Sequence, residues 1–153
     1  MKIVFIGLGR MGFPMAGHLA TAGCDITVFN RSVNKSQLWT YKFNKPHSET
    51  LADLPEEIDI VITCLKDDKS ILNILTDDGL VDKINPGGFV IDHSTTSVEL
   101  VREIYSLYKS KSISFYDSPV SGGELGAING QLSIMVGGDD PNLQQIKSII
   151  THY

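Results

Sequence analysis

The chain has 153 residues, a length that corresponds to one domain with a sizeable buried core. Its hydrophobic content of 42% and charged content of 20% are ordinary for a soluble globular protein. The net charge of −5 argues weakly against nucleic acid or an anionic membrane as a partner, and the apolar runs are too short to span a bilayer.

The two cysteines, Cys24 and Cys64, are too few for a disulfide framework or a metal site. Each lies beside an apolar run, so we expect a buried thiol at both positions. The first residues lead directly into a short apolar run and a glycine, which is too short for a secretory signal. These features together predict a cytoplasmic protein without a metal.

Short apolar runs alternate with longer amphipathic stretches, a pattern that predicts strands and helices in turn. The predicted strands are Lys2–Ile6, Ile26–Phe29, Ile58–Leu65, Phe89–Asp92, Ile113–Tyr116 and Leu132–Val136. The predicted helices are Met11–Ala22, Lys69–Leu75, Ser97–Tyr108 and Pro141–Ile150. Between Trp39 and Glu49 the pattern is weak, and we expect a helix to end there before a poor or missing third strand.

Local signals place some of the boundaries. Thr96 followed by Glu99 fits a capping box, which predicts Thr96 as the N-cap of the helix after it. Asp140 supplies an N-cap acceptor before Pro141, where the missing N–H of proline does no harm. The segment from Pro86 to Gly88 is expected to break the chain just before the strand at Phe89.

This alternation predicts an α/β fold over residues 1–153, with a mostly parallel sheet covered by helices on both faces. Right-handed crossovers then make the doubly wound arrangement the natural one. Ligands bind such sheets at the carboxyl ends of the strands, so the loops that follow the strands are the candidates for a site.

The first strand is followed by a loop with GxGxxG spacing, Gly7-Leu8-Gly9-Arg10-Met11-Gly12. This loop opens a predicted helix, and a second strand ends at Phe29, so the unit has the roughly 30 residues of a dinucleotide-binding motif. Gly7 permits a tight turn, Gly9 lets a pyrophosphate approach the backbone, and Gly12 lets helix and strand pack closely. The helix N-terminus adds N–H groups for the phosphates. The alternative is a glycine turn without a ligand.

The end of the second strand indicates which dinucleotide would bind. NAD sites usually have an acid there for the ribose 2′-hydroxyl, whereas this chain has Asn30, Arg31 and Ser32. The Arg31 guanidinium could hold a 2′-phosphate, and Asn30 and Ser32 could add neutral donors. The sequence therefore favours NADP(H) over NAD(H). The alternative is that Arg31 is a solvated residue at the start of the next helix.

Several stretches together resemble the β-hydroxyacid dehydrogenase family, which includes 3-hydroxyisobutyrate dehydrogenase and tartronate semialdehyde reductase. The family shares its Rossmann-like cofactor domain with 6-phosphogluconate dehydrogenase. The likeness covers nearly the whole chain, through "GLGRMGFPMAGHLATAG", "VFNRS", "DIVITCLKDD", "IDHSTTSV" and "DSPVSGGELGAINGQLSIMVGG". The resemblance implies reversible hydride transfer between a nicotinamide cofactor and a small 3-hydroxy acid or semialdehyde.

The resemblance also implies roles for the later loops. Leu65 and Lys66 match the loop along the nicotinamide-side ribose, although Lys66 stands where a proline is usual, and Thr95 matches a threonine beside the nicotinamide. The family's substrate-binding stretch implies that a small substrate carboxylate is bound by Ser121, Gly122 and Gly123. His93 is a tempting proton donor, but a histidine at the end of a strand is more often structural.

The family's catalytic lysine lies on a helix beyond the cofactor domain, and neither this helix nor the C-terminal helical domain is present in this sequence. Lys147 does not match that lysine in motif or position. We therefore expect little or no turnover by this chain alone. An apolar patch near the last helix is expected to favour a homo-oligomer or a partner chain. The alternatives are a stand-alone NADP-binding or docking module without catalysis, and a degenerate remnant.

Overall fold

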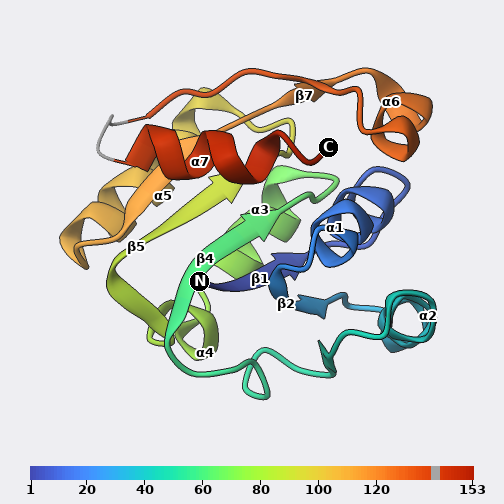
Figure 1. Cartoon of the computed structure of the whole chain (residues 1–153). Coiled ribbons are helices and arrows are strands. Elements are labelled where there is room, and N and C mark those ends of the chain that lie inside the picture. Colours follow the sequence, from blue (N-terminus) through green and yellow to red (C-terminus); the bar gives the residue numbers. More distant parts are fainter. Residues whose placement is uncertain (139–141) are drawn as a thin grey trace.

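The central feature of the computed structural model, which describes residues 1–138 and 142–153, is a six-stranded parallel sheet (Figure 1). Its strands lie in the order β3-β2-β1-β4-β5-β6, and every adjacent pair is parallel. Their bounds are β1 Lys2–Ile6, β2 Asp25–Phe29, β3 His47–Ser48, β4 Ile58–Thr63, β5 Ile84–Asp92 and β6 Ser114–Asp117. The strand order reverses between β1 and β4. The predicted doubly wound α/β fold is confirmed.

Helices cover both faces of this sheet (Figure 1). One face is covered by α1 (Gly12–Thr21), α2 (Val33–Phe43), α6 (Gly123–Asn129) and α7 (Leu143–Ile150). The other is covered by α3 (Asp68–Leu75), α4 (Asp78–Val81) and α5 (Val98–Ser110). Alternate residues of β1 enter the two cores, with Phe5 in the first and Val4 in the second. Burial on both faces explains why the strands read as continuous apolar runs.

The weak region after the second strand folds as expected from its sequence. Helix α2 ends at Phe43, and Asn44 follows in a left-handed conformation with φ of 52°. Strand β3 has only two residues and pairs with the end of β2. Helix α2 is anchored by Trp39, which is fully buried and donates its indole N–H to the Phe13 carbonyl at 3.2 Å.

Two strand predictions need correction. The last predicted strand, Leu132–Val136, is reduced to β8 (Ser133–Ile134), which pairs antiparallel with β7 (Val120–Ser121) in a separate small sheet. The connection through the short helix α6 reverses the chain, so it cannot add a parallel strand to the main sheet. In addition, β5 already begins at Ile84, and its register with β4 shifts before Phe89. The proline–glycine segment therefore distorts β5 and does not precede it.

The predicted cap of α5 is also wrong by one residue. Ser97 is the N-cap, because its hydroxyl accepts a hydrogen bond from the Leu100 N–H at 3.4 Å. The Thr96 hydroxyl donates instead to the buried Asp92 carboxylate at 3.1 Å, so it is drawn away from the helix end. The predicted cap at Asp140 and Pro141 lies outside the described residues.

This assignment leads to a testable expectation for stability. Ser97→Ala should lower the free energy of unfolding by about 1 kcal/mol, the usual value of an N-cap side chain. Glu99→Ala should change it by less than about 0.5 kcal/mol, because with Ser97 as the N-cap the Glu99 side chain forms no capping box. Urea unfolding followed by circular dichroism measures both. A larger loss for Glu99→Ala than for Ser97→Ala would contradict the assignment.

The surface differs from two expectations. Cys24 and Cys64 are unpaired and half-buried, not fully buried. Helix α7 packs Ile146 and Ile149 into the core, so the patch expected near the last helix does not lie on α7 itself. The exposed large apolar side chains near the C-terminal part of the chain are Leu125, Ile128 and Met135, on and after α6. Within the described ranges, each helix is too short or too polar to cross a membrane.

Candidate dinucleotide-binding site

A cavity of about 450 Å³ lies at the carboxyl ends of β1, β2 and β4, where the strand order reverses. This is where open α/β sheets bind their ligands. Most of the predicted cofactor residues line it, namely Gly7, Gly9, Arg10, Met11, Gly12, Asn30, Arg31, Ser32, Leu65 and Lys66. The loops that follow β1, β2 and β4, which are far apart in the sequence, thus meet around one cavity.

The three glycines of the first loop have different structural requirements. Gly7 has φ of +101°, and a Cβ there would lie 2.4 Å from the Cys64 carbonyl oxygen. A Cβ on Gly12 would lie 1.9 Å from the Gly7 carbonyl oxygen. Gly9 differs, since no atom of the described chain lies within 4 Å of a Cβ built on it. Because Gly9 lines the cavity, its missing side chain leaves space for a ligand and is not required by packing.

Asn30 holds this loop in place. Its side-chain oxygen accepts from the Leu8 N–H at 2.9 Å, and its amide nitrogen donates to the Ser32 carbonyl at 3.2 Å. The Leu8 side chain is buried in the core, so Leu8 anchors the glycine loop to the core of the domain. The end of β2 and the glycine loop are therefore joined directly by a side chain of the predicted site.

The cavity is lined by cations. Arg10, Arg31, Lys35 and Lys66 are among its lining residues, and no carboxylate is among those that the structure describes there. In a chain with a net charge of −5, this local excess of positive charge favours an anionic ligand. Lys35 was not predicted. It follows Arg31 by about one helical turn, and this spacing was the available signal.

The loop after β4 is positioned by helix α3 and by β5. Lys66 pairs with Asp67 at 3.1 Å, and Asp67 caps α3 by accepting from the Ser70 N–H at 2.8 Å. Hydrogen bonds from Ser70, and then from Lys66, lower the pKa of Asp67 to about 2. The Leu65 N–H donates to the Ser94 hydroxyl at 2.9 Å. Residues of α3 that the sequence analysis missed also line the cavity: Ser70, Asn73 and Ile74.

Under this loop lies a buried polar network centred on Asp92. Its carboxylate accepts from the hydroxyls of Thr63 at 2.7 Å and Thr96 at 3.1 Å, and from the Ser94 N–H at 3.0 Å. These bonds tie the ends of β4 and β5 together. Cys64, on the cavity wall, is a neutral thiol at physiological pH, because burial raises its pKa to about 12.

His93 is a structural residue, as its position at a strand end suggested. It is buried, and its Nδ1–H donates to the Ser118 carbonyl at 2.6 Å. Its Nε2 then accepts from the Tyr153 hydroxyl at 2.8 Å. Burial lowers the pKa of His93 to about 4, so the ring is neutral at physiological pH. With both nitrogens engaged inside the fold, His93 has no proton to deliver to the cavity.

The remaining predicted residues do not line this cavity. Thr95 is exposed in the loop after β5. Ser121 is the last residue of β7, Gly122 is the N-cap of α6 and Gly123 begins that helix, and all three are exposed. None of these four residues is in the lining of the cofactor cavity, so the structure does not join them to it in one enclosed site.

The strand order, the cavity at its reversal and the glycine loop define a dinucleotide-binding domain of the Rossmann type. A family model for the NAD-binding domain of 6-phosphogluconate dehydrogenase matches residues 2–153. The chain belongs to this family, and the resemblance to the β-hydroxyacid dehydrogenases is confirmed by its relatives.

Three known proteins illustrate the similarity. An uncharacterized oxidoreductase of Shewanella frigidimarina is 40% identical over 99% of this chain and 53% of its own length. The NAD-dependent L-serine dehydrogenase of Pseudomonas aeruginosa is 34% identical over 97% of this chain and 50% of its own. The structure of Mycobacterium tuberculosis 3-hydroxyisobutyrate dehydrogenase with L-serine matches with a TM-score of 0.90 and 31% identity, covering 99% of this chain and 51% of that one. The chain spans about half the length of these proteins.

Proposed function

We propose that this chain binds NADP(H) and forms the cofactor-binding part of a β-hydroxyacid dehydrogenase-type oxidoreductase. The observation that carries the proposal is the composition of the cavity. Gly9 leaves space beside the loop, four cationic side chains line the walls, and among the described residues no carboxylate does so. A pyrophosphate would lie against the glycine loop at the start of α1. Arg31 and Lys35, at the end of β2 and the start of α2, would hold the 2′-phosphate.

In this proposal the other predicted residues would contact the nicotinamide half of the cofactor and the substrate. Leu65 and Lys66 would contact the nicotinamide-side ribose, and Thr95 would lie beside the nicotinamide, which supplies or accepts the hydride when bound. Ser121, Gly122 and Gly123 would bind the carboxylate of a small 3-hydroxy acid or semialdehyde. The acid that protonates the developing alkoxide would come from outside the cofactor-binding part, because the family's catalytic lysine lies beyond this part and both ring nitrogens of His93 are engaged.

A second candidate is NAD(H), favoured by the name of the 34%-identical NAD-dependent L-serine dehydrogenase. The two cofactors differ in one phosphate, so Arg31 is the residue that separates them. NAD(H) would make no use of a guanidinium at this place, whereas NADP(H) would lose a charge-assisted contact without it.

The test is a fluorescence titration of the purified chain with NADPH and, in parallel, NADH. We expect saturable binding that prefers NADPH. Arg31→Asp should weaken NADPH binding about 100-fold, since it removes an ionic contact and adds a repulsive charge, while NADH binding should change far less. Arg102→Asp on α5, outside the cavity lining, is the control for the same change of charge. No saturable binding of NADPH by the folded chain would overturn the proposal, and equal binding of both cofactors would favour the second candidate.

A further inference from the structure

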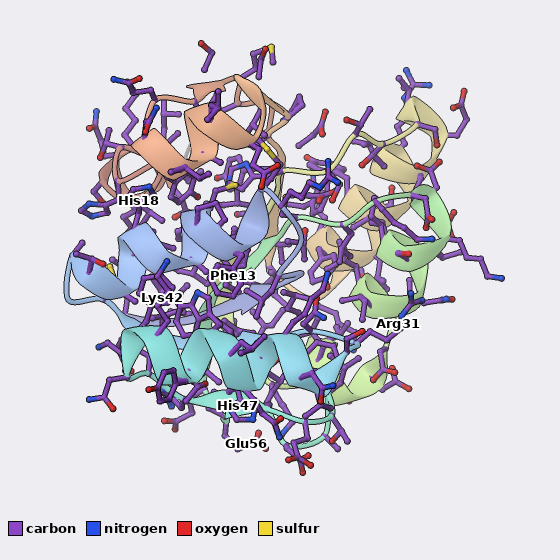
Figure 2. All side chains as sticks on the ribbon, turned by 90° about the vertical axis from the view of Figure 1, so that its right-hand side faces the viewer. Phe13, His18, Arg31, Lys42, His47 and Glu56 are labelled. Atoms are coloured by element: carbon purple, nitrogen blue, oxygen red, sulfur yellow. The ribbon has the colours of Figure 1, made fainter. Side chains whose placement is uncertain are left out.

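A second hollow is lined by residues of α1, α2 and α6. In Figure 2, α1 lies between α6 and α2. The volume of the hollow is about 590 Å³, larger than the cofactor cavity and within the range of small-molecule sites. We name it the three-helix groove. Its lining includes Phe13 and His18 from α1, Leu38 and Lys42 from α2, and Glu124 and Ile128 from α6.

The walls of the groove are apolar and partly exposed. The rings of Phe13 and Phe43 lie with their centroids 6.0 Å apart. Leu38 and Ile128 line the groove although they are 63% and 51% exposed. Apolar side chains gathered around a concave surface indicate a site for an apolar group, because covering them would remove this surface from water.

The charged groups of the groove are mainly cationic. The Lys42 amine lies 5.8 Å from the centre of the Phe13 ring and 5.2 Å from that of Phe43. Arg10 is 3.9 Å from Glu124, the one acid among the described lining residues. Neither Lys35 nor Lys42 has a carboxylate within ion-pair distance in the part of the chain that the structure describes. Within the described ranges, Glu124 is paired with Arg10, and Lys35 and Lys42 line the groove beside apolar side chains with no ion pair of their own.

The groove is held in shape by contacts between the helices. The His18 Nε2–H donates to the carbonyls of Ala127 at 2.9 Å and Ile128 at 3.1 Å, which fixes the end of α6 on α1 (Figure 2). Helices α1 and α2 meet at Gly17, where a Cβ would lie 2.3 Å from the Phe43 ring. The groove is thus built from three helices in fixed contact and is not a gap between independent parts.

We propose that the three-helix groove binds an amphiphilic organic anion, a small molecule with an apolar or aromatic body and one anionic head group. The body would lie against Phe13, Leu38 and Ile128, and the head group would pair with Lys42. Gly9, Arg10 and Lys35 line both this groove and the cofactor cavity. Occupation of the groove should therefore weaken binding of an anion in the cavity, and the reverse must hold by linkage.

The test uses the fluorescent probe anilinonaphthalene sulfonate, which has an aromatic body and a sulfonate head, on the full chain. We expect saturable one-site binding, with amide NMR shifts concentrated in α1, α2 and α6. Lys42→Glu, which touches the groove only, should weaken probe binding about tenfold, and Lys42→Arg should retain it within about twofold. Lys147→Glu on α7 makes the same charge reversal away from the groove and should leave binding unchanged.

A second pair of variants tests the apolar wall. Leu38→Gln should weaken probe binding about threefold or more, whereas Val98→Gln, at an exposed position outside the groove, should not. The proposal is overturned if Lys147→Glu weakens binding as much as Lys42→Glu, if binding does not saturate, or if the shifts map to Gly7, Asn30 and Leu65 in the cofactor cavity. Probe binding in the groove by a chain that fails to bind NADPH would support this proposal and refute the proposed cofactor.

Discussion

Gly12→Ala is expected to destabilise the fold strongly, whereas Gly9→Ala should fold normally and lose cofactor binding. At Gly12 a methyl group would lie 1.9 Å from the Gly7 carbonyl, a backbone atom that cannot move without displacing the first loop of the sheet. We expect a loss of at least about 3 kcal/mol in the free energy of unfolding, at the upper end of overpacking costs. At Gly9 the described chain leaves the position of a methyl group open, so unfolding should shift by less than about 0.5 kcal/mol.

The two variants test two separate needs of the glycine loop: Gly12 is needed for folding, and Gly9 is needed for binding the cofactor. Thermal unfolding by circular dichroism measures the first, and NADPH titration of the folded Gly9→Ala chain measures the second. We expect about a tenfold or greater loss of NADPH affinity in Gly9→Ala, because the methyl group would occupy the space beside the pyrophosphate. Unchanged affinity in a folded Gly9→Ala chain would show that no dinucleotide approaches this loop.

Stability should fall steeply between about pH 6.5 and pH 4, and His93 should be the cause. Its folded pKa of about 4 lies below the ordinary 6.5, so the folded state holds the ring neutral while the unfolded state takes up a proton. The stabilisation is complete above about pH 6.5 and is lost as the pH falls through this window. The total loss by pH 4 is about 3 kcal/mol, at about 1.4 kcal/mol for each unit of pKa.

Urea unfolding at a series of pH values tests this expectation. His93→Gln should remove most of the pH dependence in this window, and His152→Gln, at an exposed position, should retain it. Tyr153→Phe should lower stability at neutral pH by about 1 to 3 kcal/mol, because it leaves the buried Nε2 without its donor. If His93→Gln keeps the full pH dependence, another group is responsible and the interpretation is wrong.

The sequence was informative where the physical signal is local. Strands β1, β4 and β5 are buried on both faces by the helices around them, so each reads as an apolar run that needs no partner to be recognised. The glycine loop is also local, because the turn, the close approach and the start of α1 all fall within one short segment. Arg31 closely follows β2 in the sequence, so its place at the carboxyl end of this strand, on the cavity wall, could also be predicted from local signals.

The predictions from sequence were wrong where a residue or segment has a partner elsewhere in the fold. Thr96 has the right residue type and spacing for a cap, but Asp92 takes its hydroxyl, and Ser97 caps the helix. Segment 132–136 has the composition of a strand, yet α6 turns it back onto β7. Neither outcome can be read from a window of neighbouring residues, because each depends on a partner that the fold supplies.

Sequence by itself determined the α/β class, the mostly parallel sheet and the family, because these depend on periodicity and on spacing within one supersecondary unit. The tertiary structure alone decided the rest. It joined His93 to Tyr153 across 60 residues of chain and set α6 against α1 to form the three-helix groove. Contacts between distant residues form only when burial of the apolar faces has fixed the elements in space, and so they leave no pattern in the sequence around either partner.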